Sequence, residues 1–202
     1  MPRWSILICT LENRKNFLER LLTILKPQIG SYTEGGQGNY KVITGDVEIC
    51  ILSDNKVMTV GEKRNKLVEA CSGEYVSFID DDDIVSPDYV NSILRKLNSN
   101  PDVVTFYAYR FHNGKKDRRV DYDIKYEQDL NPSHKYERLP NHLCVWKKEL
   151  YLPYKDISYG EDADWSQRMK GRAKTQEKVD KILYHYYFNQ HTTETQKQFY
   201  RK

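Results

Sequence analysis

The 202-residue sequence has no long apolar run and only four, widely separated cysteines. No apolar stretch approaches the roughly 20 residues needed to cross a bilayer, and the N-terminus does not read as a secretory signal. The cysteines lie among apolar neighbours and form none of the close pairs of a zinc site: Cys9, Cys50, Cys71 and Cys144. We therefore expect buried free thiols in a soluble, cytoplasmic protein.

An excess of charge of one sign is also missing. The formal net charge is +3, from 32 basic and 29 acidic residues, so composition does not favour nucleic acid or an anionic membrane as partner. Hydrophobic residues make up 39% and recur along the whole chain, which argues against disorder. The length suits one core, and we predict a single domain over residues 1–202.

A glycine-based phosphate loop is absent. Residues 30–46 contain five glycines, but they have neither a Walker lysine motif nor GxGxxG spacing. We predict a surface loop over this segment.

The first hundred residues alternate between short apolar strands and amphipathic helices. The pattern predicts strands at 4–9, 47–52 and 75–79 and helices at about 15–25 and 60–70, ended by Pro27 and Gly73 respectively. This is a parallel α/β layout, in which ligands bind at the carboxyl ends of strands. Thr10, Asp54 and Asp80 should emerge together there.

The second half is less regular. We predict a helix after Pro87 with Ser86 as its N-cap, then a hairpin from 103–111 to 120–124 around an Asn-Gly turn. A loop-rich stretch over 129–140, a segment at 143–146, a helix opened by residues 160–165 and a final strand at about 182–188 follow.

Four consecutive aspartates, Asp80 to Asp83, directly follow the buried strand 75–79. Their mutual repulsion is costly unless cations or hydrogen-bond donors neutralise it, and their hard oxygens favour Mg²⁺ or Mn²⁺. The alternative is a solvated acidic turn before the next helix. An EF-hand is excluded, because its required glycine and carboxylate positions hold Val85 and Asn91.

Four short segments follow one another in an order that is typical of one enzyme family: SILICT at 5–10, GEKRNKL at 61–67, ACSGEY at 70–75 and FIDDDDI at 78–84. This set resembles the nucleotide-sugar half of family 2 glycosyltransferases with the GT-A fold, most strongly over residues 4–97. The resemblance implies a mixed, mostly parallel sheet flanked by helices. It also implies a nucleotide-sugar-binding half at about 1–100 and an acceptor and catalytic-base half at about 101–202.

The resemblance assigns donor roles to particular residues. Thr10 and Glu12 fall in the first nucleotide loop, Asp54 contacts uracil or an equivalent base, and Arg64 and Asn65 lie beside the diphosphate of a UDP-sugar. Asp80 and Asp82 match the DxD motif, facing the ribose and the metal, and Asp81 or Asp83 takes either role if the register shifts by one. Cys9 departs from the proline usual in the family. Lys63 and Arg64 have an alternative interpretation as exposed helix charges.

An acidic pair at Glu161-Asp162 matches the family's general base, with Asp162 as the base and Glu161 as its neighbour. A carboxylate there would accept the proton of an acceptor hydroxyl. The alternative is a pair of acids that merely stabilise a helix start. For the histidine that often completes the family's metal shell, His185 and His191 are the candidates, and neither matches cleanly.

Acceptor specificity should reside in the middle segment, where tyrosines cluster with basic residues 115–119. A glycan, a lipid-linked or protein acceptor, or modified DNA would each suit such a surface. Two other function classes remain open. A nucleotidyltransferase would release pyrophosphate, and a non-catalytic carbohydrate- or nucleic-acid-binding module would show no metal-dependent binding of nucleotide sugars.

Overall fold

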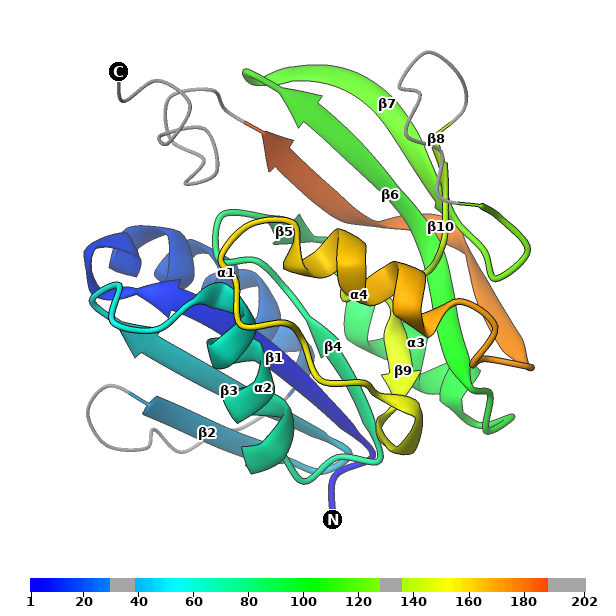
Figure 1. Cartoon of the computed structure of the whole chain (residues 1–202), viewed down its shortest axis with the longest axis horizontal. Coiled ribbons are helices and arrows are strands. Elements are labelled where there is room, and N and C mark those ends of the chain that lie inside the picture. The colour runs from blue at the N-terminus through cyan, green and yellow to red at the C-terminus, as the bar shows by residue number, and fades with distance from the viewer. Residues whose placement is uncertain (30–38, 128–135, 189–202) are drawn as a thin grey trace.

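The computed structural model describes residues 1–29, 39–127 and 136–188. One mixed sheet runs through it in the order β2-β3-β1-β4-β9-β6-β10-β5, and β7 and β8 continue from β6 (Figure 1). The strands are Trp4–Leu11 (β1), Asn39–Thr44 (β2), Val47–Asp54 (β3), Tyr75–Phe78 (β4), Ile84–Val85 (β5), Val103–His112 (β6), Lys115–Tyr122 (β7), Tyr136–Arg138 (β8), Val145–Lys147 (β9) and Gln176–Phe188 (β10). The helices are Glu12–Arg14 (η1), Lys15–Ile29 (α1), Val60–Ala70 (α2), Tyr89–Leu97 (α3), Lys148–Leu150 (η2) and Glu161–Met169 (α4).

Strand β1 pairs in parallel with β3 on one side and with β4 on the other, and the predicted site lies where these strands end. The register runs from Trp4 opposite Val47 to Leu11 opposite Asp54, so the two strands end together. A second long parallel ladder joins β6 to β10, and parallel ladders hold more residue pairs than antiparallel ones. The predicted mixed, mostly parallel α/β sheet with flanking helices is confirmed.

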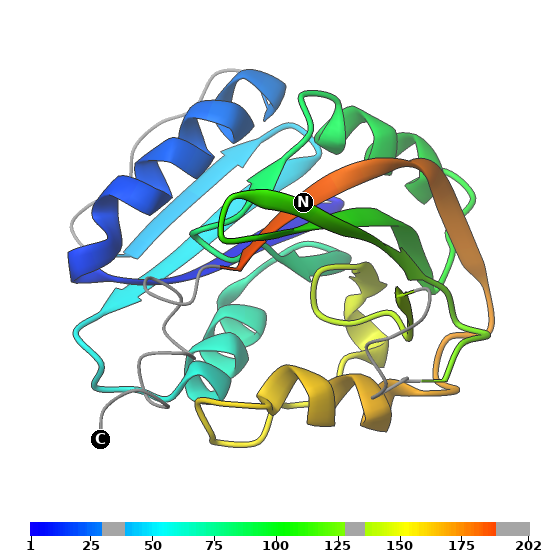
Figure 2. The ribbon, with the colours of Figure 1, turned by 90° about the horizontal axis from the view of Figure 1, so that it is seen from above.

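Helices cover both faces of the sheet. Figure 2 shows α1 and α3 on one face and α2 and α4 on the other. On the first face Trp4 packs against Tyr89 with ring centroids 5.5 Å apart. On the second, Trp146 and Trp165 meet edge to face at 5.6 Å. Trp165 is fully buried, so this aromatic core residue fixes α4 to the sheet.

Pro27 does not end the first helix, which continues to Ile29. Proline removes one backbone donor and crowds the preceding turn, which is costly in a helix interior. Only two residues follow Pro27 here, and the Gln28 side chain donates to the carbonyl oxygens of Ile24 and Ser86, both at 3.0 Å. These two bonds fix the last turn of the helix against the segment before α3.

The structure corrects three other boundaries. Part of the predicted 30–46 loop is strand β2, which pairs antiparallel with β3 along its length, while 30–38 lie outside the described residues. Helix α3 begins at Tyr89 after Asp88, and Ser86 donates its hydroxyl to the Asp88 carboxylate at 2.9 Å instead of capping the helix. The last strand begins at Gln176, because its first residues pair with Val103–Phe106.

Gly73 has a different role from helix termination. Helix α2 ends at Ala70, where the Cys71 amide donates to Leu67. Gly73 lies against β1, and its amide donates to Ser5 Oγ at 2.8 Å and to Glu48 Oε1 at 3.0 Å. A Cβ atom at this position would come within 2.4 Å of Ser5 Oγ, so the close approach itself requires glycine.

Candidate functional site

A cavity of about 690 Å³ opens at the carboxyl edge of β1 and β4, between the start of α4 and the strands β6, β7 and β8. Both halves of the chain contribute to its wall. Seven of the predicted site residues line it: Thr10, Arg64, Asp80, Asp81, Asp82, Glu161 and Asp162. Residues about 80 positions apart in the sequence therefore share one site.

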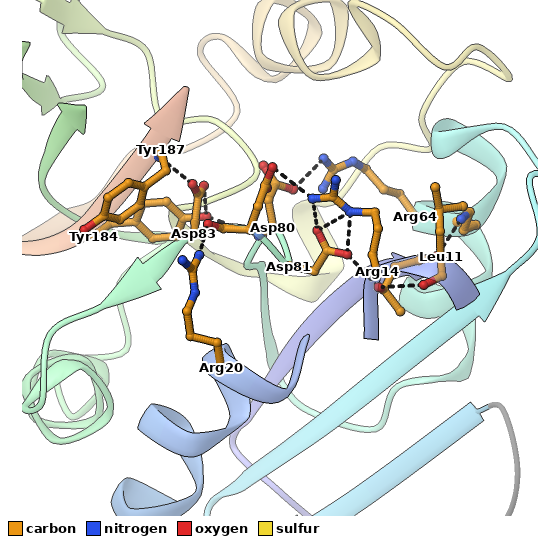
Figure 3. Close-up of polar contacts among 12 residues, drawn as sticks. Leu11, Arg14, Arg20, Arg64, Asp80, Asp81, Asp83, Tyr184 and Tyr187 are labelled. Atoms are coloured by element: carbon orange, nitrogen blue, oxygen red, sulfur yellow. Dashed lines mark hydrogen bonds and ion pairs between the residues drawn. The ribbon is translucent and has the colours of Figure 1, made fainter. Parts of the chain in front are cut away.

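The four aspartates form a tight turn in which Asp83 donates its amide to the Asp80 carbonyl at 3.1 Å. Asp81 turns toward the protein, where it accepts from Thr10 Oγ1 at 2.6 Å and from Arg14 Nη2 at 2.6 Å (Figure 3). Burial by itself would lower the Arg14 pKa, but Asp81 and Asp82 outweigh it and raise that pKa. Asp81 is therefore held as one half of a buried ion pair.

Asp83 is fully buried on the other side of the turn. It accepts from the Tyr184 hydroxyl and from the Tyr187 amide, both at 2.7 Å. Burial, together with the neighbouring Asp82 and Asp80, raises its pKa well above the ordinary value. This carboxyl group joins the turn to β10 and does not line the cavity.

Of the four aspartates, Asp80 and Asp82 both line the cavity and remain partly exposed, with side chains 32% and 20% exposed. Burial would raise the Asp80 pKa, but His142 and Arg64 lower it overall. The Asp82 pKa is raised, chiefly by burial, although Arg14 Nη2 lies 2.9 Å from Oδ2. The outer pair of the motif thus faces the space where a ligand would bind, and this geometry favours the unshifted register.

Arg64 is buried between the rings of Phe78 and Tyr154, with centroids 4.7 and 5.6 Å from its guanidinium carbon. It reaches Asp80 Oδ1 at 3.2 Å and Glu161 Oε1 at 3.4 Å. The interpretation as an exposed helix charge is wrong for this residue. It is also wrong for the equally buried Lys63, because both side chains turn into the site edge of the sheet.

Lys63 and Asp54 form a buried ion pair beneath the cavity. Asp54 Oδ2 also accepts the amides of Val57 and Met58, both at 2.8 Å. Burial opposes ionisation of Asp54, but Lys63 and these amides lower its pKa. Asp54 does not line the cavity. Its carboxylate shapes the 55–58 turn, and its contact with a base stays a prediction.

Asn65 likewise does not reach the cavity. Its side-chain amide accepts from the Tyr154 N–H at 2.7 Å and donates to the Tyr154 carbonyl at 3.0 Å. Its position beside a diphosphate stays a prediction. Both polar ends of the side chain fix the segment that leads into α4.

The acidic pair begins α4, directly after Gly160 in the left-handed conformation at φ +74°. Glu161 is buried toward Arg64, and burial raises its pKa against the opposing effect of Arg64. Asp162 has a side chain that is 42% exposed and lines the cavity. Within the pair, Asp162 is the carboxylate that an acceptor hydroxyl could reach.

His142 connects the two halves of the site, and sequence reasoning missed it. Its Nε2 lies 3.5 Å from Asp80 Oδ2 and its Nδ1 lies 3.9 Å from Asp162 Oδ2. A lone histidine in a loop-rich segment carries no signal by itself. Arg14 was missed too, although a basic residue just after a predicted nucleotide loop could have been considered.

Two further predicted residues lie elsewhere. Glu12 is exposed on η1 outside the cavity lining. His185 packs edge to face on Phe111 at 5.7 Å, and burial and then Lys116 lower its pKa. His185 is not among the residues that line the cavity, and its role as a metal ligand stays a prediction. His191 lies outside the described residues.

The site fits a divalent cation that is shared with a ligand. Within the described ranges no three His, Cys, Asp or Glu side chains group closely enough to hold a metal by themselves. Mg²⁺, however, is usually bound by one or two carboxylates together with substrate phosphates and water. Asp80 and Asp82, both partly exposed at the cavity, are a donor set of that kind.

Gly61 offers a test of how α4 is held. A Cβ atom there would lie 1.9 Å from the Lys155 carbonyl oxygen, a backbone atom that must move. We expect Gly61→Ala to lower the free energy of unfolding by about 1–3 kcal/mol, despite alanine's better helix propensity. Because Lys155 precedes Asp162 closely, activity should fall by up to about 100-fold. Glu62→Ala, on the same turn, is the control, and unfolding curves with steady-state rates compare the two. Unchanged values for Gly61→Ala would contradict the close contact.

Comparison with known proteins identifies the family to which this chain belongs. The profile of "Glycosyl transferase family 2" matches residues 40–149, more than half of the chain. The chain belongs to glycosyl transferase family 2. A curated relative, "Putative glycosyltransferase EpsH" of Bacillus subtilis (strain 168), is 29% identical over 143 residues, which cover 63% of this chain. The chain spans only 41% of that relative's length.

Solved structures agree on the fold. S. aureus TarS 1-349 in complex with UDP matches with a TM-score of 0.65 at 15% identity, over 94% of this chain and 61% of the TarS 1-349 chain. The complex of the same protein with UDP-GlcNAc gives a TM-score of 0.65 at 16% identity, over 93% and 59%. The GT-A fold predicted for this family 2 member is thus confirmed. None of the described helices is long and apolar enough to cross a membrane.

Proposed function

We propose that this chain transfers a sugar from a nucleoside diphosphate sugar, most simply a UDP-sugar, to an acceptor hydroxyl. Family membership and the UDP and UDP-GlcNAc complexes of TarS support this donor class. The observation that carries the proposal is the meeting of Asp80 and Asp82 with Asp162 in one cavity. A single histidine ring separates the donor-side carboxylate of Asp80 from that of Asp162.

Each residue has a role that follows from its position. Asp162, the more exposed acid, takes the proton of the acceptor hydroxyl as that oxygen attacks the anomeric carbon. The resemblance to family 2 glycosyltransferases implies that this single displacement inverts the anomeric carbon. Asp80 faces the ribose, and Arg64 provides positive charge beside the leaving diphosphate. Glu161 keeps Arg64 in place from the other side.

Asp82, with Asp80, would hold Mn²⁺ or Mg²⁺. When bound, such an ion offsets the charge that develops on the diphosphate leaving group. Arg14 already contacts Asp82 Oδ2, so its guanidinium orients this carboxylate toward the cavity. The four cysteines are free thiols, which supports a reducing, cytoplasmic setting for the reaction.

Donor binding can be measured without knowing the acceptor. We expect UDP with Mn²⁺ to raise the melting temperature by about 5 °C or more at saturating concentration, and EDTA to abolish most of the shift. ADP and GDP serve as base controls. Asp82→Asn should lose the Mn²⁺-dependent part of the shift. If no nucleoside diphosphate stabilises the protein, the donor assignment is wrong, and an intact Mn²⁺ effect in Asp82→Asn would place the metal elsewhere.

The same protein and donor also distinguish glycosyl transfer from nucleotidyl transfer. With a UDP-sugar and a mixture of acceptors, a glycosyltransferase releases UDP, whereas a nucleotidyltransferase releases pyrophosphate. The order of SILICT, GEKRNKL and FIDDDDI favours the first, and product analysis by chromatography decides between them.

A further inference from the structure

The wall of the cavity opposite the aspartates is built by β6, β7 and β8. On its inner face Ala108 and Val120 are direct partners, and both line the cavity. Two residues further along, Arg110 pairs with Arg118, and strand alternation puts both on that same face. In β8, Tyr136 and Arg138 line the cavity as well. In Figure 1 this hairpin extends beyond the rest of the sheet.

Three guanidinium groups surround one aromatic ring on this wall. The centroid of Tyr136 lies 4.3 Å from the guanidinium carbon of Arg138, 5.2 Å from that of Arg118 and 5.7 Å from that of Arg110. Arg110 Nη1 also donates to the Tyr136 hydroxyl at 3.4 Å. The ring thus holds the planar cations in place along the cavity, as cation–π contacts do.

The arginines of this wall are paired with carboxylates less completely than the basic residues of the donor side. Asp117, at the bulge of the hairpin, pairs with Arg110 at 2.6 Å and with Arg118 at 3.2 Å. Arg138 forms no ion pair with any residue that the structure describes. On the donor side, by contrast, Arg14, Lys63 and Arg64 each face a carboxylate.

We propose that Arg138, with Arg110 and Arg118, forms a subsite for an anionic group on the acceptor. This inference rests on the proposed transferase function and narrows its acceptor class to molecules that bear a phosphate or a carboxylate near the hydroxyl that reacts. Guanidinium forks match both groups in geometry and bind them through charge-assisted hydrogen bonds. Arg138 lines the same cavity as Asp162, so one acceptor can contact both residues.

Three probes with one hexose ring test this subsite: glucose, glucose 6-phosphate and glucuronate, each titrated into the protein by calorimetry. The titrations are run with and without saturating UDP, so that the phosphate of the probe does not occupy the donor site. We expect at least one charged probe to bind about tenfold more tightly than glucose, with a preference that weakens at high salt. The tighter of the two identifies phosphate or carboxylate as the natural group.

Arg119→Gln provides a matched control, because Arg119 is exposed on the opposite face of β7, over the ring of Tyr107. It removes the same charge as Arg138→Gln. We expect Arg138→Gln to abolish most of the preference, Arg138→Lys to retain part of it, and Arg119→Gln to leave it unchanged. UDP affinity should be the same in all three variants.

Two results would overturn the subsite: equal affinity for all three probes, or equal losses in Arg138→Gln and Arg119→Gln, which would indicate only net charge. Failure of UDP to bind would instead count against the donor assignment. The preference of the UDP-free protein for charged probes, and its loss in Arg138→Gln, would still report on the subsite.

Discussion

Asp162→Asn is expected to lower kcat by about 10²–10⁴-fold while UDP affinity stays within about twofold. Asparagine keeps the size of the side chain but cannot accept the proton of an attacking hydroxyl. The ring of His142 lies between Asp162 and Asp80 on the donor side. The loss should therefore appear in turnover and leave donor binding intact.

Asp164→Asn is the matched control for this experiment. Asp164 lies in the same first turn of α4, but it pairs with Lys155 and with Arg168 at 2.7 Å, away from the cavity. Exposed pairs of this kind contribute only about 0–1 kcal/mol. We expect a small change in stability and nearly normal turnover. Both variants are measured by release of UDP in the presence of acceptor and by UDP titration.

A wild-type rate in Asp162→Asn would remove Asp162 from the chemistry and leave it as a helix-start acid. A loss of UDP affinity in parallel with turnover would instead indicate a disturbed cavity. The first outcome directs attention to His142, whose Nδ1 lies 3.9 Å from the Asp162 carboxylate.

The N-terminal half of the fold could be predicted because local patterns and long-range structure agree there. The strands at 4–9, 47–52 and 75–79 are apolar runs, and burial on both faces is what a central parallel strand requires. The 60–70 helix has the predicted bounds, since Thr59 caps it by accepting the Glu62 amide at 3.0 Å. Pattern and packing favoured the same elements.

The C-terminal half was harder to predict, because its strands pair with segments far away along the chain. The first residues of β10 alternate weakly in polarity, and they become strand by pairing with β6 from Gln176 onward. The bend of the β6–β7 hairpin comes from a register shift next to Arg110 that places Asp117 at a bulge. No local signal marks either feature.

Within the site, the roles that could not be predicted from the sequence are those that depend on which side chains are buried together. The motif names Asp80 to Asp83 as a set, but only the fold shows Asp81 against Arg14 and Asp83 against Tyr184. Spacing in sequence does not reveal that a charge at position 14 lies beside one at 81. For the same reason Asn65, close to Arg64 in sequence, contacts the backbone of Tyr154 instead of the cavity.

Arg64 also contacts residues that are far from it in the sequence. We expect its substitution to lower the free energy of unfolding more than the other substitutions proposed. The side chain is buried between two aromatic rings and faces Asp80 and Glu161. In Arg64→Gln both carboxylates lose their shared cation, and the Glu161 carboxylate loses it in a buried place. Breaking a buried ion pair from one side costs about 3–5 kcal/mol, a large part of the stability of a typical domain. Urea unfolding at low temperature measures the loss.

A double variant separates this structural effect from catalysis. Glu161 is the more buried of the two partners, and burial already raises its pKa. In Arg64→Gln/Glu161→Gln the buried uncompensated charge is gone, so we expect about half or more of the lost stability to return. Transfer activity should stay at least about 100-fold below wild type, because no guanidinium faces Asp80 and the leaving diphosphate.

Arg64→Lys tests the shape of the cation as distinct from its charge. Lysine keeps the positive charge but lacks the planar fork that reaches two carboxylates while stacked between Phe78 and Tyr154. We expect intermediate stability and weak activity. If the double variant were no more stable than Arg64→Gln, the Arg64–Glu161 contact would not be coupled. If it recovered full activity, the charge at Arg64 would hold α4 in place without acting on the donor.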